Sequence, residues 1–140
     1  MDFVSELKVE DRSFVGSLKR AHEIRGENPA LAFTNGGSYT AKELMLGSAR
    51  LAHVFAQKGT KPGDRIAIIA GNSVEYLWAM FGASWIGACP AGLNVHLRGG
   101  TMEHQINNLD PTIIVCENAT LEAVEAVLGN DPRIMNIDTD

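Results

Sequence analysis

The feature that most constrains the fold is a run of consecutive apolar residues, Ile66–Ile69, which follows the turn Pro62–Asp64. Side chains of a strand alternate between the two faces of a sheet, so an unbroken apolar run places apolar groups on both faces. Both faces must then be covered, as they are in the interior of a parallel sheet. Residues 65–70 are therefore predicted to form an inner strand of an α/β fold.

Helical and strand patterns alternate along the chain from Thr40 onward. This alternation predicts an α/β fold with a doubly wound, mainly parallel sheet that is flanked by helices and joined by right-handed crossovers. The predicted helices begin at Thr40, at Asn72 or Ser73, at Thr101 and at Leu121. The predicted strands are 65–70, 88–93, 112–116 and 134–137.

The residues before Thr40 predict a helical region. Apolar residues at helical spacing over Glu10–Ile24, ended by Gly26, predict one helix. Residues 1–28 are assigned to this N-terminal helical region. The whole chain, 1–140, is expected to be a single α/β domain, the truncated N-terminal segment of a larger protein.

A small hairpin is predicted between this helix and the next. Ala30–Phe33 and Ser38–Tyr39 flank Asn35-Gly36-Gly37, a sequence typical of a tight hairpin turn. Thr40 and Glu43 then have the spacing of a capping box, which predicts the start of a helix.

Proline and cysteine positions add two expectations. Pro90 lies within strand 88–93 and has no N–H for the ladder, so this strand is expected at an edge or with a bulge. Cys89 and Cys116 lie in apolar stretches. They are expected to be reduced core residues, which is typical of an intracellular protein.

Composition and charge exclude several classes. The chain has 140 residues, 45% hydrophobic and 21% charged, which fits a globular domain and excludes a disordered or collagen-like chain. Its net charge of −5 disfavours a nucleic-acid partner. The least charged stretch, 76–94, is broken by glycines and Pro90, so no transmembrane segment is expected. The first residues are acidic without an apolar run, so no signal peptide is expected and the predicted location is cytoplasmic.

Motifs that would carry chemistry are absent from the sequence. No glycine-rich loop is followed by Lys and Ser or Thr, and no strand leads into a dinucleotide-binding turn. His96 and His104 are eight residues apart, which is not a spacing typical of metal ligands. No nucleophile elbow is present. The residues alone therefore predict an α/β domain without a visible active site.

Four stretches, in this order, resemble motifs of the adenylate-forming superfamily, which includes acyl-CoA synthetases, luciferases and peptide-synthetase adenylation domains. They are Ser38–Leu44 (SYTAKEL), Lys58–Ala67 (KGTKPGDRIA), Asn72–Tyr76 (NSVEY) and Gly82–Asn94 (GASWIGACPAGLN). The continuation Asn94–Arg98 (NVHLR) looks most like fatty-acyl-CoA synthetases of the very-long-chain or fatty-acid-transport type.

The resemblance implies an ATP-dependent fatty-acid–CoA ligase. Such an enzyme activates a carboxylic acid with ATP and Mg²⁺, forms an acyl-adenylate and transfers the acyl group to coenzyme A. The family motifs that hold ATP and perform the reaction lie beyond residue 140. The resemblance therefore implies that the 140-residue chain alone is inactive, has no catalytic or metal-binding residue and binds no cofactor by itself.

Gly92, Asn94 and Arg98 match the positions that face coenzyme A in this family. A glycine there would allow close approach to the backbone and an arginine would contact a phosphate. For each residue an alternative stays open. The alternative for Arg98 is a solvated side chain or a salt bridge, for Asn94 a turn held by its side chain, and for Gly92 a purely conformational role.

The remaining alternatives concern side-chain roles, function and assembly. Trp78, Phe81 and Trp85 lie at helical spacing and are expected to be core residues and not the lining of an acyl-chain site.

The second hypothesis for function is a free-standing, non-catalytic α/β binding or interaction module. Bare sheet edges and apolar helix faces predict a homodimer or a larger assembly. For the full-length protein, a peripheral membrane association is left open.

Overall fold

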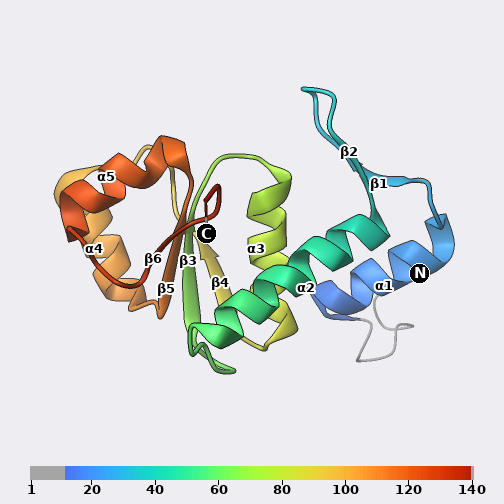
Figure 1. Cartoon of the computed structure of the whole chain (residues 1–140), viewed down its shortest axis with the longest axis horizontal. Helices are drawn as coiled ribbons and strands as arrows, with labels where there is room; N and C mark the ends of the chain where they lie inside the picture. Colours follow the sequence, from blue (N-terminus) through green and yellow to red (C-terminus); the bar gives the residue numbers. More distant parts are fainter. Residues whose placement is uncertain (1–11, 140) are drawn as a thin grey trace, which may run out of the picture.

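The computed structural model describes residues 12–139, which form five helices and six strands (Figure 1). The helices are α1 (Phe14–Arg25), α2 (Ala41–Gln57), α3 (Val74–Trp85), α4 (Gly99–Leu109) and α5 (Asn118–Leu128). The strands are β1 (Pro29–Ala32), β2 (Ser38–Thr40), β3 (Arg65–Ile69), β4 (Cys89–Gly92), β5 (Ile113–Cys116) and β6 (Ile134–Asn136). Of the predicted N-terminal helical region, residues 1–11 lie outside the described residues.

The main sheet confirms the predicted α/β class. Its four strands lie in the order β4-β3-β5-β6 and all neighbouring pairs are parallel. The apolar run Ile66–Ile69 lies in β3, between two neighbours, and is fully buried. A strand with apolar side chains on both faces thus occupies an inner position, where helices cover both faces.

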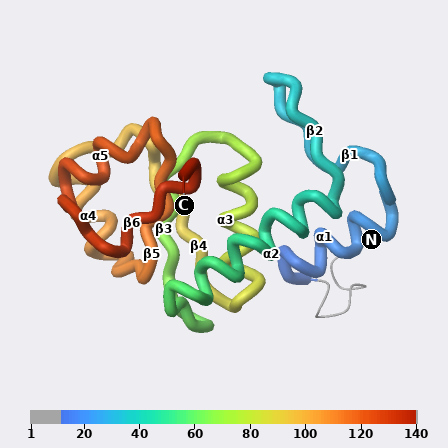
Figure 2. Tube along the Cα trace, viewed as in Figure 1, coloured from blue at the N-terminus to red at the C-terminus, as the bar shows by residue number. Residues whose placement is uncertain are grey.

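Two helical layers cover the sheet, and each has its own core (Figures 1 and 2). On one face, Phe55 of α2 and Ala79 of α3 pack on Ile66 and Ile68. On the other face, helices α4 and α5 pack on the alternate side chains of β3 and β5; the buried members there are Ala67, Ile69, Met102, Ile106, Ile114, Cys116 and Val124. The sheet is therefore doubly wound, as predicted.

Pro90 lies in an edge strand, as predicted. Cys89 N donates to Asp64 O at 2.7 Å and Leu93 N donates to Ile68 O at 2.9 Å, so these alternate N–H groups face β3. The backbone nitrogen of Pro90 faces away from β3, so the missing N–H removes no hydrogen bond between the two strands. The expectation that Cys89 is a core residue is wrong: its thiol is exposed because it begins this edge strand. Cys116 is buried, as expected.

Side-chain caps explain where the helices begin. The predicted capping box of Thr40 and Glu43 is present, with Glu43 N donating to Thr40 Oγ1 at 3.1 Å. The N-cap of α3 is Ser73 and not Asn72. Helices α4 and α5 begin at Gly99 and Asn118, earlier than the sequence predicts. The spacing of large apolar residues does not reveal these first turns, because they consist of glycine, alanine and polar residues.

Helix α1 and the β1–β2 hairpin form a third, smaller core with α2 and α3. Leu18, Leu44 and Val74 are its buried residues. An aromatic chain joins the hairpin to α3, because Tyr39 makes edge-on contacts with Phe33 at 6.1 Å and with Trp78 at 6.4 Å between ring centroids. Beyond these contacts the hairpin stands away from the helices (Figures 1 and 2).

Close packing joins α2 to α3. A Cβ added at Gly82 would lie 2.9 Å from Ser48 O, so only glycine allows this approach of two helix backbones. Ser48 Oγ donates to Met45 O at 2.9 Å and accepts from Trp85 Nε1 at 3.0 Å. Trp78 and Phe81 are half-buried, consistent with the predicted core role. Trp85 is 36% exposed, so that expectation holds for it only in part.

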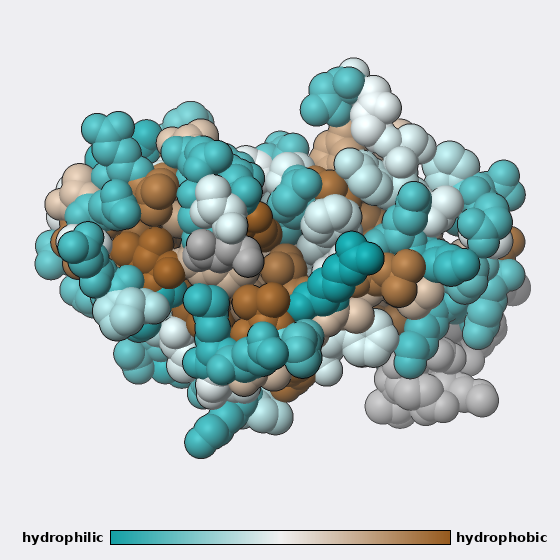
Figure 3. Space-filling model, viewed as in Figure 1, coloured by the Kyte–Doolittle hydropathy of each residue, from teal (hydrophilic) through white to brown (hydrophobic). Residues whose placement is uncertain are grey.

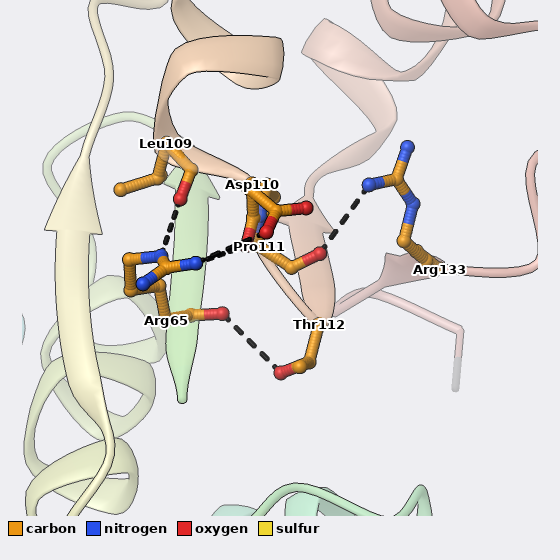
Figure 4. A network of polar contacts seen from close by, with 6 residues as sticks. All are labelled: Arg65, Leu109, Asp110, Pro111, Thr112 and Arg133. Carbon is orange, nitrogen blue, oxygen red and sulfur yellow. Dashed lines mark hydrogen bonds and ion pairs between the residues drawn. The ribbon is translucent and has the colours of Figure 1, made fainter. Parts of the chain in front are cut away.

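At the amino ends of the strands, one polar network joins the start of β3 to the turn between α4 and β5 (Figure 4). The Arg65 guanidinium donates to Leu109 O and to Asp110 O and Oδ2, the last at 3.1 Å. Asp110 has a φ of 49°, a left-handed conformation at the helix end. This network fixes the end of the sheet opposite to the candidate site described next.

Candidate functional site

The candidate site lies at the carboxyl ends of β3, β4 and β5. In a doubly wound sheet, ligands bind outside this edge, at the point where neighbouring strands lead to helices on opposite faces. Here β3 leads to α3 on one face, whereas its neighbour β5 leads to α5 on the other. The crevice between β3 and β5 is therefore the switch point of this sheet, where a ligand would be expected to bind.

Side chains of the protein itself bridge this crevice. The Glu117 carboxylate, directly after β5, accepts a hydrogen bond from Gly71 N at 3.0 Å. The buried hydroxyl of Thr120, in the first turn of α5, donates to Ile69 O at 2.6 Å. Both groups join the end of β3 to the start of α5. The end of β3 thus has partners within the protein, one of them an anionic carboxylate.

The loop after β4 contains the three residues selected from the sequence. Asn94 Oδ1 accepts from His96 N at 2.8 Å, so its side chain holds a turn. Arg98 Nη1 donates to Val95 O at 2.8 Å and to Leu97 O at 2.6 Å. The guanidinium is therefore bound to carbonyls of its own loop and makes no salt bridge among residues 12–139.

Gly92 has a neighbour that explains the glycine. A Cβ at this position would collide with the Tyr76 hydroxyl. Tyr76 comes from the first turn of α3 and reaches across to the carboxyl end of β4. The close approach at Gly92 is thus made by a side chain of the protein itself. Tyr76 is a residue of the candidate site to which the sequence analysis gave no role. It appeared there only as the last residue of the stretch Asn72–Tyr76.

A hollow of about 440 Å³ lies beside this edge, between the hairpin and the start of α3. Its wall is mixed: the hairpin contributes both apolar and polar side chains, and the loop after β3 contributes polar ones. The lining residues are Leu31, Ala32, Phe33, Thr34, Asn35, Asn72, Ser73, Tyr76 and Leu77. A second, smaller hollow on the hairpin shares Phe33, Asn35, Asn72 and Ser73 with it and adds Glu75.

The carboxyl edge of the sheet contains the three residues selected from the sequence and others that the sequence analysis did not select. Gly92, Asn94 and Arg98 do come together, in one loop at the carboxyl end of β4. Glu117 was missed, although its position directly after an apolar strand was a usable signal. The hairpin residues were missed because no sequence pattern shows that the hairpin packs beside α3. Within the described residues, no group of three His, Cys, Asp or Glu side chains could hold a metal ion.

Most of the chain matches a known family. Residues 18–139 match the family described as AMP-binding enzyme. The chain belongs to this family. The matched residues include all of β1 to β6 and the three loops of the candidate site.

Curated relatives bear names of CoA ligases and of a transport protein. Long-chain fatty acid transport protein 6 of Mus musculus is 27% identical over 118 residues, which are 84% of this chain and 19% of the mouse protein. The 3-oxocholest-4-en-26-oate–CoA ligase of Rhodococcus rhodochrous is 26% identical over 120 residues, 86% of this chain and 21% of that ligase. The chain thus spans about a fifth of the length of these relatives.

Solved structures show the same fold. The N-terminal domain of FACL13 from Mycobacterium tuberculosis, crystallised with an inhibitor, has a TM-score of 0.81 at 19% identity, over 91% of this chain and 34% of that one. A fatty acyl CoA synthetase of the same organism has a TM-score of 0.82 at 17% identity, over 94% of this chain and 28% of the other.

Proposed function

We propose that this chain is the N-terminal part of an ATP-dependent fatty-acid–CoA ligase. The observation that carries the proposal is the family match over residues 18–139, which includes every strand of the sheet. The names of the curated relatives support the CoA-ligase reaction and a fatty-acid substrate. In the longer enzyme, ATP and Mg²⁺ would serve acyl-adenylate formation, and coenzyme A would accept the acyl group.

The described residues do not by themselves fit ATP. A triphosphate needs several N–H donors and cations around it. At the switch point, the Gly71 N–H is already bound by the carboxylate of Glu117, which would repel a phosphate. No glycine-rich phosphate loop is present in the sequence. In this proposal, the groups that hold the triphosphate come from outside these 140 residues.

An acyl-CoA formation assay tests the proposal. The 140-residue chain, supplied with ATP, Mg²⁺, coenzyme A and fatty acids, is expected to form no acyl-CoA, whereas a complete ligase of the family assayed in parallel gives product. Turnover by the chain alone would contradict the proposed incompleteness. The coding sequence after Asp140 provides a second check: the proposal requires it to continue into a Ser/Thr/Gly-rich loop that ends in Pro-Lys-Gly.

For Gly92, Asn94 and Arg98 we propose the coenzyme A side of that longer enzyme. The Arg98 Nη1 bonds to Val95 O and Leu97 O set the shape of the loop, so the role of Arg98 includes positioning it. In the complete ligase, Arg98→Ala is expected to raise the KM for coenzyme A several-fold and to leave the KM for ATP unchanged. Equal changes in both constants, or none, would remove the assignment.

The competing function is a non-catalytic α/β binding or interaction module. If the coding sequence ends near Asp140 without the phosphate loop, this second function replaces the first. Titration calorimetry then separates the two further, because a module of another function has no reason to bind either coenzyme A or ATP.

No helix among the described residues is long and apolar enough to cross a bilayer. A cytoplasmic location stays a prediction.

A further inference from the structure

Asn35-Gly36 is the only Asn-Gly pair in the 140 residues. It lies at the tip of the β1–β2 hairpin, which stands away from the helices (Figure 1). Both residues are exposed, and a Cβ placed on Gly36 would have nothing within 4 Å. Gly36 has a φ of 100°, which a residue with a side chain rarely adopts. The backbone nitrogen after Asn35 is therefore unshielded by any side chain.

The turn also holds the Asn35 side chain beside the backbone that follows it. Asn35 Oδ1 accepts from Gly37 N at 3.4 Å, so the side-chain amide lies over the peptide of Gly36. Gly36 N donates to Phe33 O at 3.0 Å, and this bond must open before the nitrogen can react. Bonds at an exposed hairpin tip open with little free energy, since local fraying exposes no core.

Several of the other asparagines are held differently. Asn107 and Asn108 lie within α4, where the helix restrains the backbone nitrogen that follows. Asn94 Oδ1 and Asn118 Oδ1 accept stronger hydrogen bonds, each at 2.8 Å. Asn72 is exposed like Asn35 but is followed by Ser73, which has a side chain. It is the matched comparison within the same molecule.

The geometry points to Asn35 as a site of spontaneous covalent modification, the conversion to aspartate and isoaspartate. Gly36 N loses its proton and forms a bond to Asn35 Cγ, the Cγ–Nδ2 bond breaks, and ammonia leaves with the proton. Water then adds to either carbonyl of the five-membered ring and opens it. The reaction consumes one water for each ammonia released and needs no oxidant or enzyme.

The modification changes the candidate site. Asn35 lines both hollows of the hairpin, and the smaller hollow is also lined by Glu75. A new carboxylate there adds negative charge beside an existing one, which disfavours anionic ligands. The isoaspartate form also lengthens the backbone by one carbon within the turn that Phe33 N closes through its bond to Gly37 O at 2.7 Å. The hairpin register is then no longer fixed.

Incubation of the purified chain tests this inference. Samples are held at 37 °C at neutral and mildly alkaline pH, and peptide mapping by mass spectrometry follows each asparagine over time. We expect aspartate and isoaspartate to accumulate several-fold faster at residue 35 than at Asn72. We also expect the rate to rise in proportion to hydroxide concentration, because the Gly36 nitrogen must be deprotonated. A rate at residue 35 no higher than at Asn72 would overturn the assignment.

A variant confirms the chemical step. Asn35→Gln keeps the side-chain amide but would form a larger, less favourable ring, so the mass change at this position should disappear. Its hairpin is checked by the fluorescence of Trp78, which contacts the hairpin through Tyr39. If Asn35→Gln keeps the native fluorescence and yet gains mass at residue 35 at the original rate, the ring mechanism is wrong.

Discussion

At the scale of single residues, two kinds of position decide how this fold is held together: glycines at close contacts and charged side chains at loop ends. Gly82 allows α3 to approach the backbone of α2, and Gly92 leaves room for the Tyr76 hydroxyl. The sequence shows both glycines but does not show what approaches them. Other glycines, such as Gly100, face open space.

Substitution of Gly82 by alanine is expected to destabilise the chain. The added Cβ would meet Ser48 O, a backbone atom that moves only if a helix moves, and overpacking of this kind costs about 1–3 kcal/mol. Urea denaturation measures the free energy of unfolding. Gly100→Ala is the control: it lies in α4 with nothing within 4 Å, and alanine should be neutral or stabilising there. Equal stability of the two variants would contradict the packing argument.

The pair of Asp131 and Arg133 predicts a dependence on pH. The Arg133 guanidinium donates to the Asp131 carboxylate at 2.7 Å and lowers the pKa of that carboxyl below its ordinary value of 3.8. A depressed folded-state pKa contributes stability above the unfolded pKa, and this stability is lost as the pH falls through the folded pKa.

Asp131→Asn tests this dependence. The difference in unfolding free energy between the wild type and the variant should be constant above about pH 5 and should shrink in acid as the carboxyl is protonated. Denaturation at a series of pH values measures it. A difference that stays constant down to strongly acidic pH would show that the ionised carboxylate contributes nothing.

At the scale of elements, the first turn of α5 joins two strands of the sheet. Thr120 donates from its buried hydroxyl to Ile69 O at the end of β3. The Thr120 hydroxyl oxygen, Oγ1, also accepts a hydrogen bond from Glu117 N at 3.1 Å. The Thr120 hydroxyl is thus one of two side-chain links, with the Glu117 carboxylate that accepts from Gly71 N, between the end of β3 and the start of α5. Helix α5 begins three residues before the predicted Leu121 because Asn118, Ala119 and Thr120 form its first turn.

Thr120→Val, which keeps the shape and removes the hydroxyl, is expected to cost about 1–3 kcal/mol because buried polar groups lose their partner. Thr120→Ser keeps the hydroxyl and should retain most of the stability. Thermal denaturation of both variants measures the loss, and amide hydrogen exchange at Gly71 reports whether the crevice opens. Valine and serine variants of equal stability would show that the bond to Ile69 O is not important.

At the scale of the whole molecule, the sheet has two bare edges within the described residues. Strand β4 has Pro90 on its outer side, which blunts strand addition, whereas the outer side of β6 has no such proline. Among residues 12–139, the large apolar side chains that are exposed are Phe14, Ile24, Leu46 and Trp85. In the view of Figure 3, apolar areas are separated by polar side chains.

Self-association of the isolated chain is the prediction at this scale. We expect a dimer or larger assembly, formed through the bare edge of β6 and exposed apolar side chains. Light scattering at micromolar concentration measures the mass. Lysine at two exposed apolar positions, Ile24→Lys and Leu46→Lys, should shift the assembly toward monomer, whereas Glu122→Lys on the exposed face of α5 should not. A wild-type chain that is monomeric over this range would contradict the prediction.

Sequence and structure agree most closely where a local pattern has one physical explanation. An apolar run such as Ile66–Ile69 must be buried on both faces, and the capping box of Thr40 and Glu43 joins groups only three residues apart. Both were predictable because the interactions are either local or averaged over a whole face. The exposure of Cys89 was not predictable in this way, since its neighbours in the sequence are apolar but its strand is at an edge.

The sequence by itself determined the order of helices and strands, the parallel sheet, the hairpin and the family, because these depend on periodicity, turns and motif spacing within short stretches. Only the tertiary structure decided that Glu117 reaches Gly71, that the Tyr76 hydroxyl fills the space beside Gly92 and that Arg98 bonds to its own loop. The first two contacts join residues far apart in the chain, and the third depends on the path of one loop. A one-dimensional pattern does not specify which side chains meet across strand ends.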